Sequence, residues 1–183
     1  MSYAVKMMDI NVIYISGSPR ENSNTDYLLR ITQSITGGTF IKLSKHHIGY
    51  WSENIVEDDM DKTIIPLILQ ADSIVLGSPV YFNNVSAQMK TFMDRMGPLH
   101  GKMERLRNKI GGAIVVGRRD GVEGAITAIN AFFLKHEMIP ANRGVCGFAW
   151  EEGEIKQDIE AIESAKKLGH RIIALVELTK RES

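Results

Sequence analysis

Cysteine is nearly absent from this chain. Cys146 is the single cysteine among 183 residues. One thiol cannot form a disulfide or a multi-thiolate metal site within one chain, and such sparing use of cysteine is typical of a reducing compartment. We therefore expect a protein of the cytoplasm.

Net charge is lacking as well. Lysine plus arginine number 22 and aspartate plus glutamate number 22, so the formal net charge is zero. Proteins that bind nucleic acid or anionic membranes usually carry an excess of basic residues. No apolar run reaches the roughly 20 residues of a membrane-spanning helix, and residues 1–10 lack the apolar core of a leader peptide. We expect small-molecule partners, with no nucleic acid and no membrane.

Short apolar runs do alternate five times with segments of helical period. This alternation is typical of an α/β fold in which helices cover both faces of a mostly parallel sheet, and the length fits one domain spanning 1–183. The predicted strands cover 10–16, 39–43, 72–77, 110–117 and 144–149. The predicted helices are one that ends at Gly37-Gly38, one from an N-cap at Ser86 to a stop at Gly97-Pro98, and others at 64–70, 123–137 and 155–178.

Residues 44–61 show neither helical nor strand period. The stretch contains His46 and His47 and ends in an acidic run. Loops of this length inside compact domains are uncommon and often functional, lids especially, so we predict a long loop or cap. Adjacent histidines point apart on an extended chain, so solvated loop residues are expected here rather than a metal site.

The first predicted strand runs into a polar turn, Gly17–Thr25. A turn between a strand and a helix can bind phosphate through backbone N–H groups and the positive end of the helix dipole. The same composition suits an ordinary turn in which Ser23 or Asn24 caps the helix, so the turn alone leaves both interpretations open. The side chains that could add donors to a phosphate are Ser18, Arg20, Ser23, Asn24 and Thr25.

The spacing around this turn excludes three classes of protein. Gly17 is followed neither by the further glycines of a Gly-x-Gly-x-x-Gly dinucleotide loop nor by the Gly-Lys-Ser/Thr of a P-loop. A phosphoacceptor receiver domain needs an acidic pocket at the end of its first strand, where this chain has Ser16-Gly-Ser-Pro-Arg20.

Loops after the third and fourth strands should meet this turn, because ligands of open parallel sheets bind beyond the carboxyl ends of the strands. In the first of these loops Tyr81 and Phe82 offer flat apolar surface, and Asn83 and Asn84 offer amide donors, which suits an isoalloxazine ring. The rings could equally do no more than pack the turn.

The loop after the fourth strand is rich in glycine and arginine. Gly117 and Gly124 permit close approach of the backbone, and Arg118 and Arg119 bring positive charge. Reduced flavin is negatively charged near N1, so a guanidinium there would stabilise it. A solvated arginine pair on an exposed turn is the alternative that the sequence leaves open.

Two motifs in this chain resemble those of a known family. They read Ser16-Gly-Ser-Pro-Arg-x-x-Ser-Asn-Thr25 and Ser78-Pro-Val-Tyr-x-x-x-Val-Ser-Ala-Gln-Met-Lys-x-Phe-Met-Asp-Arg95. The chain thereby resembles, in order and over nearly its whole length, the NADPH-dependent FMN reductase and iron-sulfur flavoprotein family. The resemblance implies a flavodoxin-like three-layer sandwich with a five-stranded parallel sheet of order 2-1-3-4-5.

The resemblance also implies a cofactor and partners. FMN would lie between the subunits of a homodimer or homotetramer, and electrons would pass from NADPH or NADH to a quinone, free flavin or another acceptor. The residues implied for the phosphate are Ser18, Arg20, Ser23, Asn24 and Thr25. The residues implied for the ring are Pro79, Val80, Tyr81, Phe82, Asn83, Asn84, Val85, Gly117, Arg118 and Gly124.

This chain departs from the iron-sulfur members at one place. Those members carry a compact set of cysteines just before an Asp-Asp-Met like Asp58-Asp59-Met60, whereas residues 45–56 here contain no cysteine. A four-thiolate cluster is therefore impossible within one chain. The prediction is a protein that works with flavin alone and holds no metal.

The predicted function is an FMN-dependent oxidoreductase. The protein would supply orientation, exclusion of water and charge near N1, with no catalytic triad and no obligatory acid or base. Two alternatives stay open. One is a flavodoxin-type electron carrier, although such carriers commonly dock through an acidic face that this neutral chain does not offer. The other is a structural or regulatory relative that has lost the ligand.

Overall fold

The computed structural model describes residues 9–97 and 105–181. Its strands are β1 Val12–Ser16, β2 Thr39–Lys42, β3 Ser73–Tyr81, β4 Asn84–Val85, β5 Ile110–Gly117, β6 Ile139–Pro140 and β7 Val145–Phe148. Its helices are α1 Asn24–Thr36, α2 Ile65–Gln70, α3 Ala87–Arg95, α4 Val122–Lys135 and α5 Ile159–Arg181, with single turns η1 Leu43–Lys45, η2 Met60–Ile64 and η4 Glu154–Gln157.

The parallel strands stand in the order β2-β1-β3-β5, followed by β6 and β7. Both short strands pair with β5, β6 with its start and β7 with its end, so together they fill the fifth position. The flavodoxin-like order 2-1-3-4-5 is therefore confirmed. The sequence predicted only the β7 part of this last position, because β6 is two residues long.

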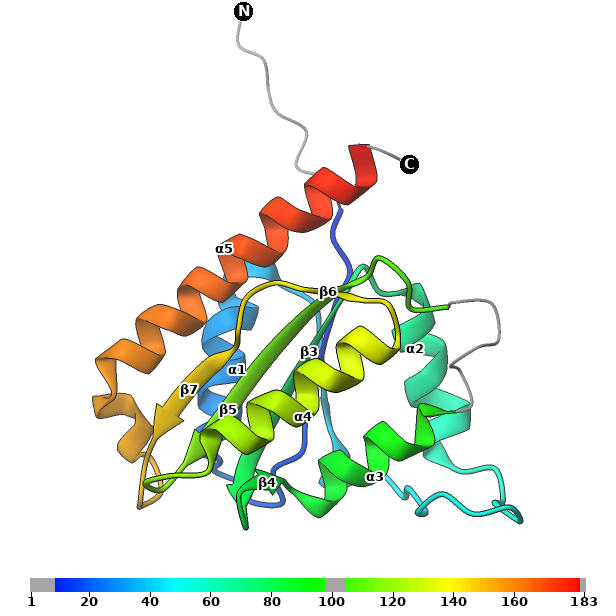
Figure 1. Cartoon of the computed structure of the whole chain (residues 1–183), viewed down its shortest axis with the longest axis horizontal. Helices are drawn as coiled ribbons and strands as arrows, with labels where there is room; N and C mark the ends of the chain where they lie inside the picture. Colours follow the sequence, from blue (N-terminus) through cyan, green and yellow to red (C-terminus); the bar gives the residue numbers. More distant parts are fainter. Residues whose placement is uncertain (1–8, 98–104, 182–183) are drawn as a thin grey trace, which may run out of the picture.

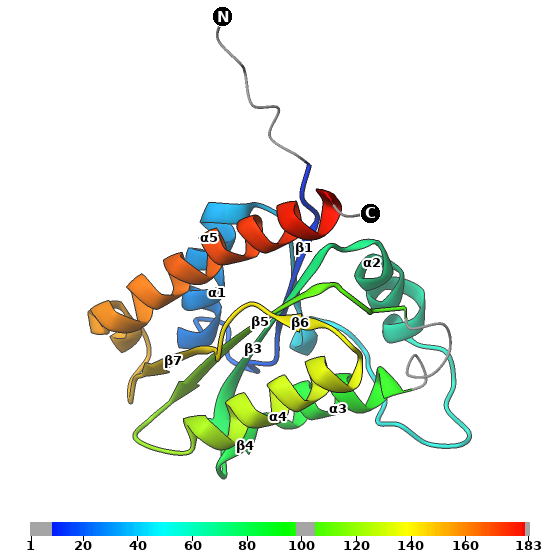
Figure 2. The ribbon, with the colours of Figure 1, turned by 45° about the horizontal axis from the view of Figure 1, so that its top comes forward.

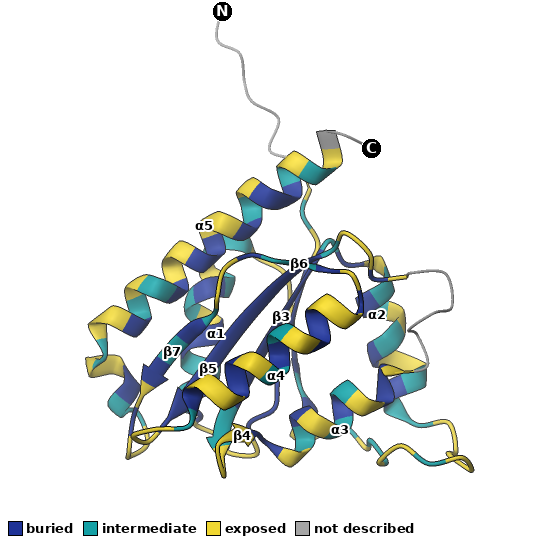
Figure 3. Cartoon of the chain, viewed as in Figure 1, coloured by how far each residue is buried: buried dark blue, intermediate teal, exposed yellow. Residues whose placement is uncertain are grey.

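Two helical layers cover the sheet (Figures 1 and 2). Alternate residues of β1 serve different layers: Ile13 and Ile15 pack with the buried side chains of α2, α3 and α4, and Val12 and Tyr14 with those of α1 and α5. Side chains that alternate across a strand produce this division. On α4 and α5 the exposed residues lie on the outer side and the buried ones toward the central sheet (Figure 3).

The third strand is longer than predicted. β3 continues past Gly77 to Tyr81, and the chain turns back at Phe82 and Asn83 into β4, which pairs antiparallel with β3. Both turn residues have positive φ, 48° and 61°, as in the two-residue type I′ turns that match the twist of a hairpin. The predicted loop after the third strand is therefore mostly a β-hairpin.

The ends of several helices also differ from the predictions. The helix before β3 begins earlier, as the π-helical turn η2, so Asp61 at the end of the 44–61 stretch is helical, while Glu57 and Asp58 stay in the loop. The last helix is interrupted at Asp158, whose carboxylate accepts hydrogen bonds from the N–H groups of Phe148 and Ala161, both at 2.9 Å. Helix α3 ends at Arg95 with Met96 as its C-cap, and the predicted stop at Pro98 lies outside the described residues.

Candidate functional site

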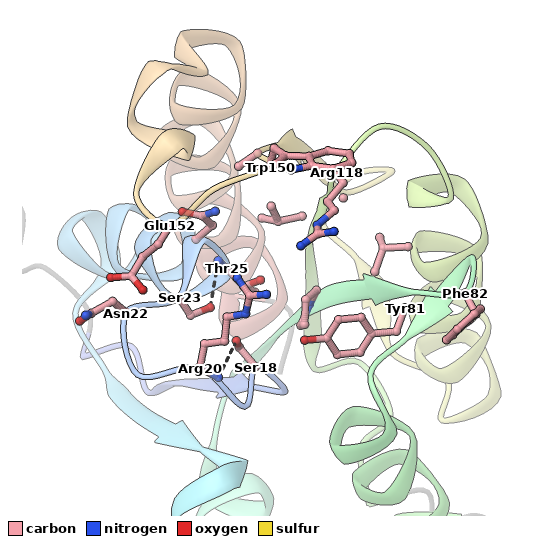
Figure 4. Close-up of a pocket in the computed structure, with 16 residues that line it drawn as sticks. Ser18, Arg20, Asn22, Ser23, Thr25, Tyr81, Phe82, Arg118, Trp150 and Glu152 are labelled. Carbon is pink, nitrogen blue, oxygen red and sulfur yellow. Dashed lines mark hydrogen bonds between the residues drawn. The ribbon is translucent and has the colours of Figure 1, made fainter.

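A cavity of about 310 Å³ opens at the carboxyl edge of the sheet. Four segments line it: the turn before α1, the end of β3 with its hairpin, the end of β5, and the loop after β7. The described lining residues are Ser18, Arg20, Asn22, Ser23, Asn24, Thr25, Pro79, Val80, Tyr81, Phe82, Val116, Gly117, Arg118, Ala149, Trp150 and Glu152. In Figure 4 the turn before α1 lies on one side, Tyr81 lies opposite, and Arg118 and Trp150 span the space between.

The turn of residues 17–25, called the 17–25 turn below, is held by its own hydroxyl groups. The Oγ of Ser23 caps α1 by accepting hydrogen bonds from the N–H groups of Thr25 and Asp26 at 3.1 and 3.2 Å. The N–H of Arg20 donates to Ser18 Oγ at 3.4 Å. Ser18, Ser23 and Thr25 are all buried at the wall of the cavity. An accepting hydroxyl keeps its own hydrogen to donate, so the wall offers donors to an anion.

Gly17 ties this turn to the start of α3. Its N–H donates to Gly77 O at 2.8 Å, and its carbonyl accepts from Ser86 Oγ at 2.6 Å. Ser86 is the N-cap of α3, as predicted, and its Oγ accepts from Met89 N. A Cβ on residue 17 would lie 2.7 Å from Met89 Cβ and 2.9 Å from Ser86 Oγ, so the packing admits only glycine.

Asn24 lines the cavity, but its side-chain amide serves a neighbouring loop. Its Nδ2 donates to Glu151 O and its Oδ1 accepts from Gly153 N, both at 2.8 Å. Asn24 therefore fastens the loop after β7 to the start of α1. Sequence reasoning predicted it as a donor to a phosphate, and the structure engages both ends of its amide elsewhere.

The opposite wall of the cavity is more exposed. Tyr81 is 40% exposed and turns its hydroxyl toward the cavity, whereas the ring of Phe82 is fully exposed and points away from it (Figure 4). The guanidinium of Arg118 stacks on the indole of Trp150, 4.6 Å from the ring centroid, in cation–π contact. Flat side chains and a positive charge therefore meet at the mouth.

Four predicted site residues do not line this cavity. Val85 is buried in the core, and Asn84 accepts a hydrogen bond from its N–H through Oδ1. A Cβ on Gly124 would lie 2.1 Å from Asn83 O, so Gly124 allows α4 to pack against the tip of the hairpin. Asn83 and Gly124 thus shape the hairpin from behind.

Sequence reasoning missed five lining residues. Asn22 lies within the predicted turn, and Val116 is the last residue but one of β5. The other three, Ala149, Trp150 and Glu152, follow β7. Their position just beyond a parallel strand is the feature that could have identified them, since the fifth strand ends at the same edge as the first, third and fourth.

Residues 46–58, called the 46–58 segment below, contribute nothing to the described lining of the cavity. The predicted cap is instead fixed by Arg95, which is 4% exposed. Its guanidinium donates to Asp58 Oδ2 and Asp61 Oδ2, both at 2.6 Å, and to Gly49 O at 2.9 Å. The segment is therefore clamped against α3.

The Arg95 clamp shifts the titration of Asp58. Burial acts to raise the pKa of this carboxyl, but the hydrogen bonds from Arg95 and from the N–H groups of Gly49 and Met60 outweigh it, and the pKa falls to about 2. Asp58 is therefore ionised at neutral pH and forms a buried ion pair with Arg95.

The described residues contain neither a cluster of metal-ligating side chains nor a helix that could span a membrane. Across 9–97 and 105–181, no group of three or more His, Cys, Asp or Glu side chains is placed to hold a metal ion. His46 lies 3.7 Å from Asp59, Nδ1 to Oδ2. None of the helices in these ranges has the length and apolar character needed to cross a membrane.

A parallel sheet of this order, with a cavity beyond the ends of β1, β3 and β5, defines a flavodoxin-like α/β protein. The fold agrees with that of a WrbA-like flavodoxin from Agrobacterium tumefaciens, with a TM-score of 0.68 at 14% identity over 93% of this chain and 99% of that one. The structure of RosB, which holds a formylated riboflavin 5′-phosphate, is similar with a TM-score of 0.79 at 15% identity, over 94% of this chain and 81% of that one.

Sequence comparison gives the family. Residues 10–151 match the model of the NADPH-dependent FMN reductases, and the chain belongs to that family. An iron-sulfur flavoprotein of Methanocaldococcus jannaschii is 37% identical over 94% of this chain and 100% of its own length. This chain has the single thiol of Cys146, in β7, and cannot by itself supply the four thiolates of a cluster.

Proposed function

We propose that this chain binds FMN in the cavity at the carboxyl edge of the sheet and acts as an oxidoreductase that takes electrons from NADPH or NADH. The observation that carries the proposal is the composition of the cavity walls, with buried hydroxyl donors at a helix N-terminus on one side and flat rings with an arginine on the other. Family membership supports the same function.

The donor set fits a phosphate. Ser18, Ser23 and Thr25 bring hydroxyl groups to the start of α1, where the helix dipole favours an anion. Arg20 adds a guanidinium that lies over the same wall (Figure 4). We assign the phosphate to these four residues and to backbone N–H groups of the turn, with Asn24 acting through the loop it fastens.

The other wall fits a flat ring. Pro79, Val80 and Tyr81 present apolar surface from β3, and Gly117 keeps the end of β5 free of a side chain. When bound, FMN would accept a hydride from the nicotinamide and pass electrons to a quinone, free flavin or another small acceptor. Arg118 would hold positive charge at the ring, and Trp150 would limit the access of water.

Purification tests the proposal directly. The protein is isolated, its bound flavin is identified by chromatography, and oxidation of NADPH and of NADH is followed with a quinone as acceptor. We expect FMN and steady-state turnover. A protein that binds FMN but does not oxidise either nucleotide would favour an electron carrier. A colourless protein with no affinity for added FMN would favour a relative that has lost the ligand.

We further propose that the chain forms a homodimer or homotetramer. The fully exposed ring of Phe82, held out by the hairpin beside the cavity, supports a partner chain at this place, because aromatic side chains are enriched at the cores of interfaces. Analytical ultracentrifugation of the wild type and of Phe82→Ser tests this. A monomeric wild type would contradict it.

A further inference from the structure

Lys42 lies directly behind the 17–25 turn. It is the last residue of β2, and the parallel register of the sheet sets it beside Ser16, the last residue of β1. Its side chain is only 11% exposed. It is not among the described residues that line the cavity, so it does not reach a ligand there.

The ammonium of Lys42 has three protein acceptors. It donates to the backbone carbonyl of Arg20, to that of Glu21 at 3.3 Å, and to Asp26 Oδ2 at 2.5 Å. The other carboxylate oxygen, Asp26 Oδ1, accepts from Ser16 Oγ. Three acceptors account for the three hydrogens of an ammonium group. The ammonium group of Lys42 thereby joins strand β2 to the 17–25 turn and to the N-terminal end of α1.

These contacts fix which way the peptide groups of the turn face. In a trans peptide the C=O and the following N–H point in opposite directions. Because the carbonyls of Arg20 and Glu21 face Lys42, the N–H groups of Glu21 and Asn22 face away from it. Asn22 and Ser23 line the cavity, whereas Lys42 is not among the residues described as lining it. Successive N–H groups that face one way form the nest that binds phosphate.

We propose that Lys42 is a positioning residue that gives the cavity its preference for a phosphorylated flavin. It acts through the carbonyls of Arg20 and Glu21, without touching the ligand. The neighbouring Asp26 neutralises its charge, so the preference comes from the direction of the backbone N–H groups and not from the charge of Lys42. This inference rests on the proposed binding of FMN.

The test compares the affinity for FMN with that for riboflavin, which lacks the phosphate, by quenching of flavin fluorescence. Each hydrogen bond to a charged group is strong enough that losing one or two should weaken FMN binding by roughly 10- to 100-fold in Lys42→Met. Riboflavin affinity should change by less than about threefold. A purely structural defect would weaken both flavins alike, and that result would overturn the inference.

Lys45→Met is the matched control. Lys45 is also a lysine near the turn, but it pairs with the exposed side chain of Glu21 and not with its backbone. The Lys45→Met variant removes the same charge as Lys42→Met, and its ratio of FMN affinity to riboflavin affinity should stay within about twofold of wild type. Lys42→Gln, which keeps hydrogen-bond donors without charge, should retain more of the preference than Lys42→Met and provides a second variant should the methionine variant fold poorly.

A double variant separates orientation from charge. Lys42→Met leaves Asp26 as an unpaired carboxylate near the phosphate, and Lys42→Met/Asp26→Asn removes that repulsion. If orientation is the cause, the double variant stays at least about 10-fold weaker for FMN than wild type. Full recovery of FMN affinity would overturn the inference. A wild type that binds neither flavin would overturn the proposed function, and a wild type that prefers FMN together with an unaffected Lys42→Met would overturn this inference alone.

Discussion

The 17–25 turn and the 46–58 segment are both irregular and polar, yet their polar groups face different ways. In the 17–25 turn the carbonyls of Arg20 and Glu21 accept hydrogen bonds from Lys42, and hydroxyl groups remain at the wall of a cavity. In the 46–58 segment His47 N donates to the neighbouring Asp59 at 2.7 Å, Gly49 N donates to Asp58 at 2.8 Å, and Gly49 O and Asp58 accept from Arg95.

This difference suits the polar groups of the 17–25 turn to ligand binding and those of the 46–58 segment to stabilising the fold. Polar groups that are fully paired inside a protein stabilise one arrangement of the chain and leave nothing for a ligand. Polar groups held in place from behind, with donors left at a cavity, can bind an anion without reorganisation. Length and composition alone would class the two stretches together.

The largest expected effect is on the 46–58 segment. Arg95→Met removes one partner of a buried ion pair, so the free energy of unfolding should fall by about 3 to 5 kcal/mol, measured by urea denaturation. The folded variant should still bind FMN within about threefold of wild type. The exposed pair of the same helix, Lys90 and Asp94, provides the control, since Lys90→Met should cost less than about 0.5 kcal/mol. Strongly weakened FMN binding in Arg95→Met would break the contrast between the two regions.

The next effect belongs to the 17–25 turn. Gly17→Ala forces a Cβ against Met89 Cβ and Ser86 Oγ, so the free energy of unfolding should fall by about 2 to 3 kcal/mol. Unlike Arg95→Met, this variant should also lose FMN affinity, by roughly 10-fold or more, because the turn itself is displaced. A Cβ on Gly97 would meet no atom of residues 9–97 and 105–181 within 4 Å, so Gly97→Ala is the matched control for both measurements. Unchanged FMN affinity in Gly17→Ala would show that the turn tolerates displacement.

The third prediction concerns pH. The pKa of Asp58 is about 2 in the folded chain and near its ordinary value of 3.8 in the unfolded chain. The carboxylate's contribution to the free energy of unfolding is therefore complete above about pH 4 and is lost as the pH falls toward 2. The difference in unfolding free energy between wild type and Asp58→Asn should shrink by about 2 kcal/mol between pH 5 and pH 2. Urea titrations at several pH values measure it, and a constant difference would contradict the role of the ion pair.

The smallest effect is expected at the exposed wall of the cavity. Tyr81→Ala removes a ring that is 40% exposed, and FMN affinity should fall by about fivefold, equivalent to about 1 kcal/mol. Tyr81→Phe keeps the ring and should recover most of that loss. Equal affinities for all three proteins would show that the ring only packs the hairpin.

The parallel strands themselves and the 17–25 turn could be predicted because they depend on local patterns, whereas the order of the strands followed only from the resemblance to the family. Apolar runs of strand length, the glycines at 37 and 38, and the N-caps at Ser23 and Ser86 each leave a mark in a few consecutive residues. Strand β6 escaped prediction because two residues have no period.

The rest of the site depends on contacts between distant parts of the chain. Asn24 looks like a donor to a phosphate until the loop at 151–153 is seen to take both ends of its amide. Residues 82 and 83 look like a loop until Val80 and Val85 pair across them. The Arg95 clamp joins residues 34 and 37 positions apart, a distance at which sequence spacing carries no information.

The hairpin at Phe82 and Asn83 has a consequence for the history of the sequence. A non-glycine residue at positive φ costs of order 1 kcal/mol, and Asn-Gly is the pair that a type I′ turn favours. Selection for stability alone would therefore replace Phe82 at this tip. In relatives that share this hairpin, an aromatic residue kept at position 82 would indicate selection for a contact that the ring makes. The residue at this position therefore distinguishes relatives whose hairpins make such a contact from those whose hairpins do not.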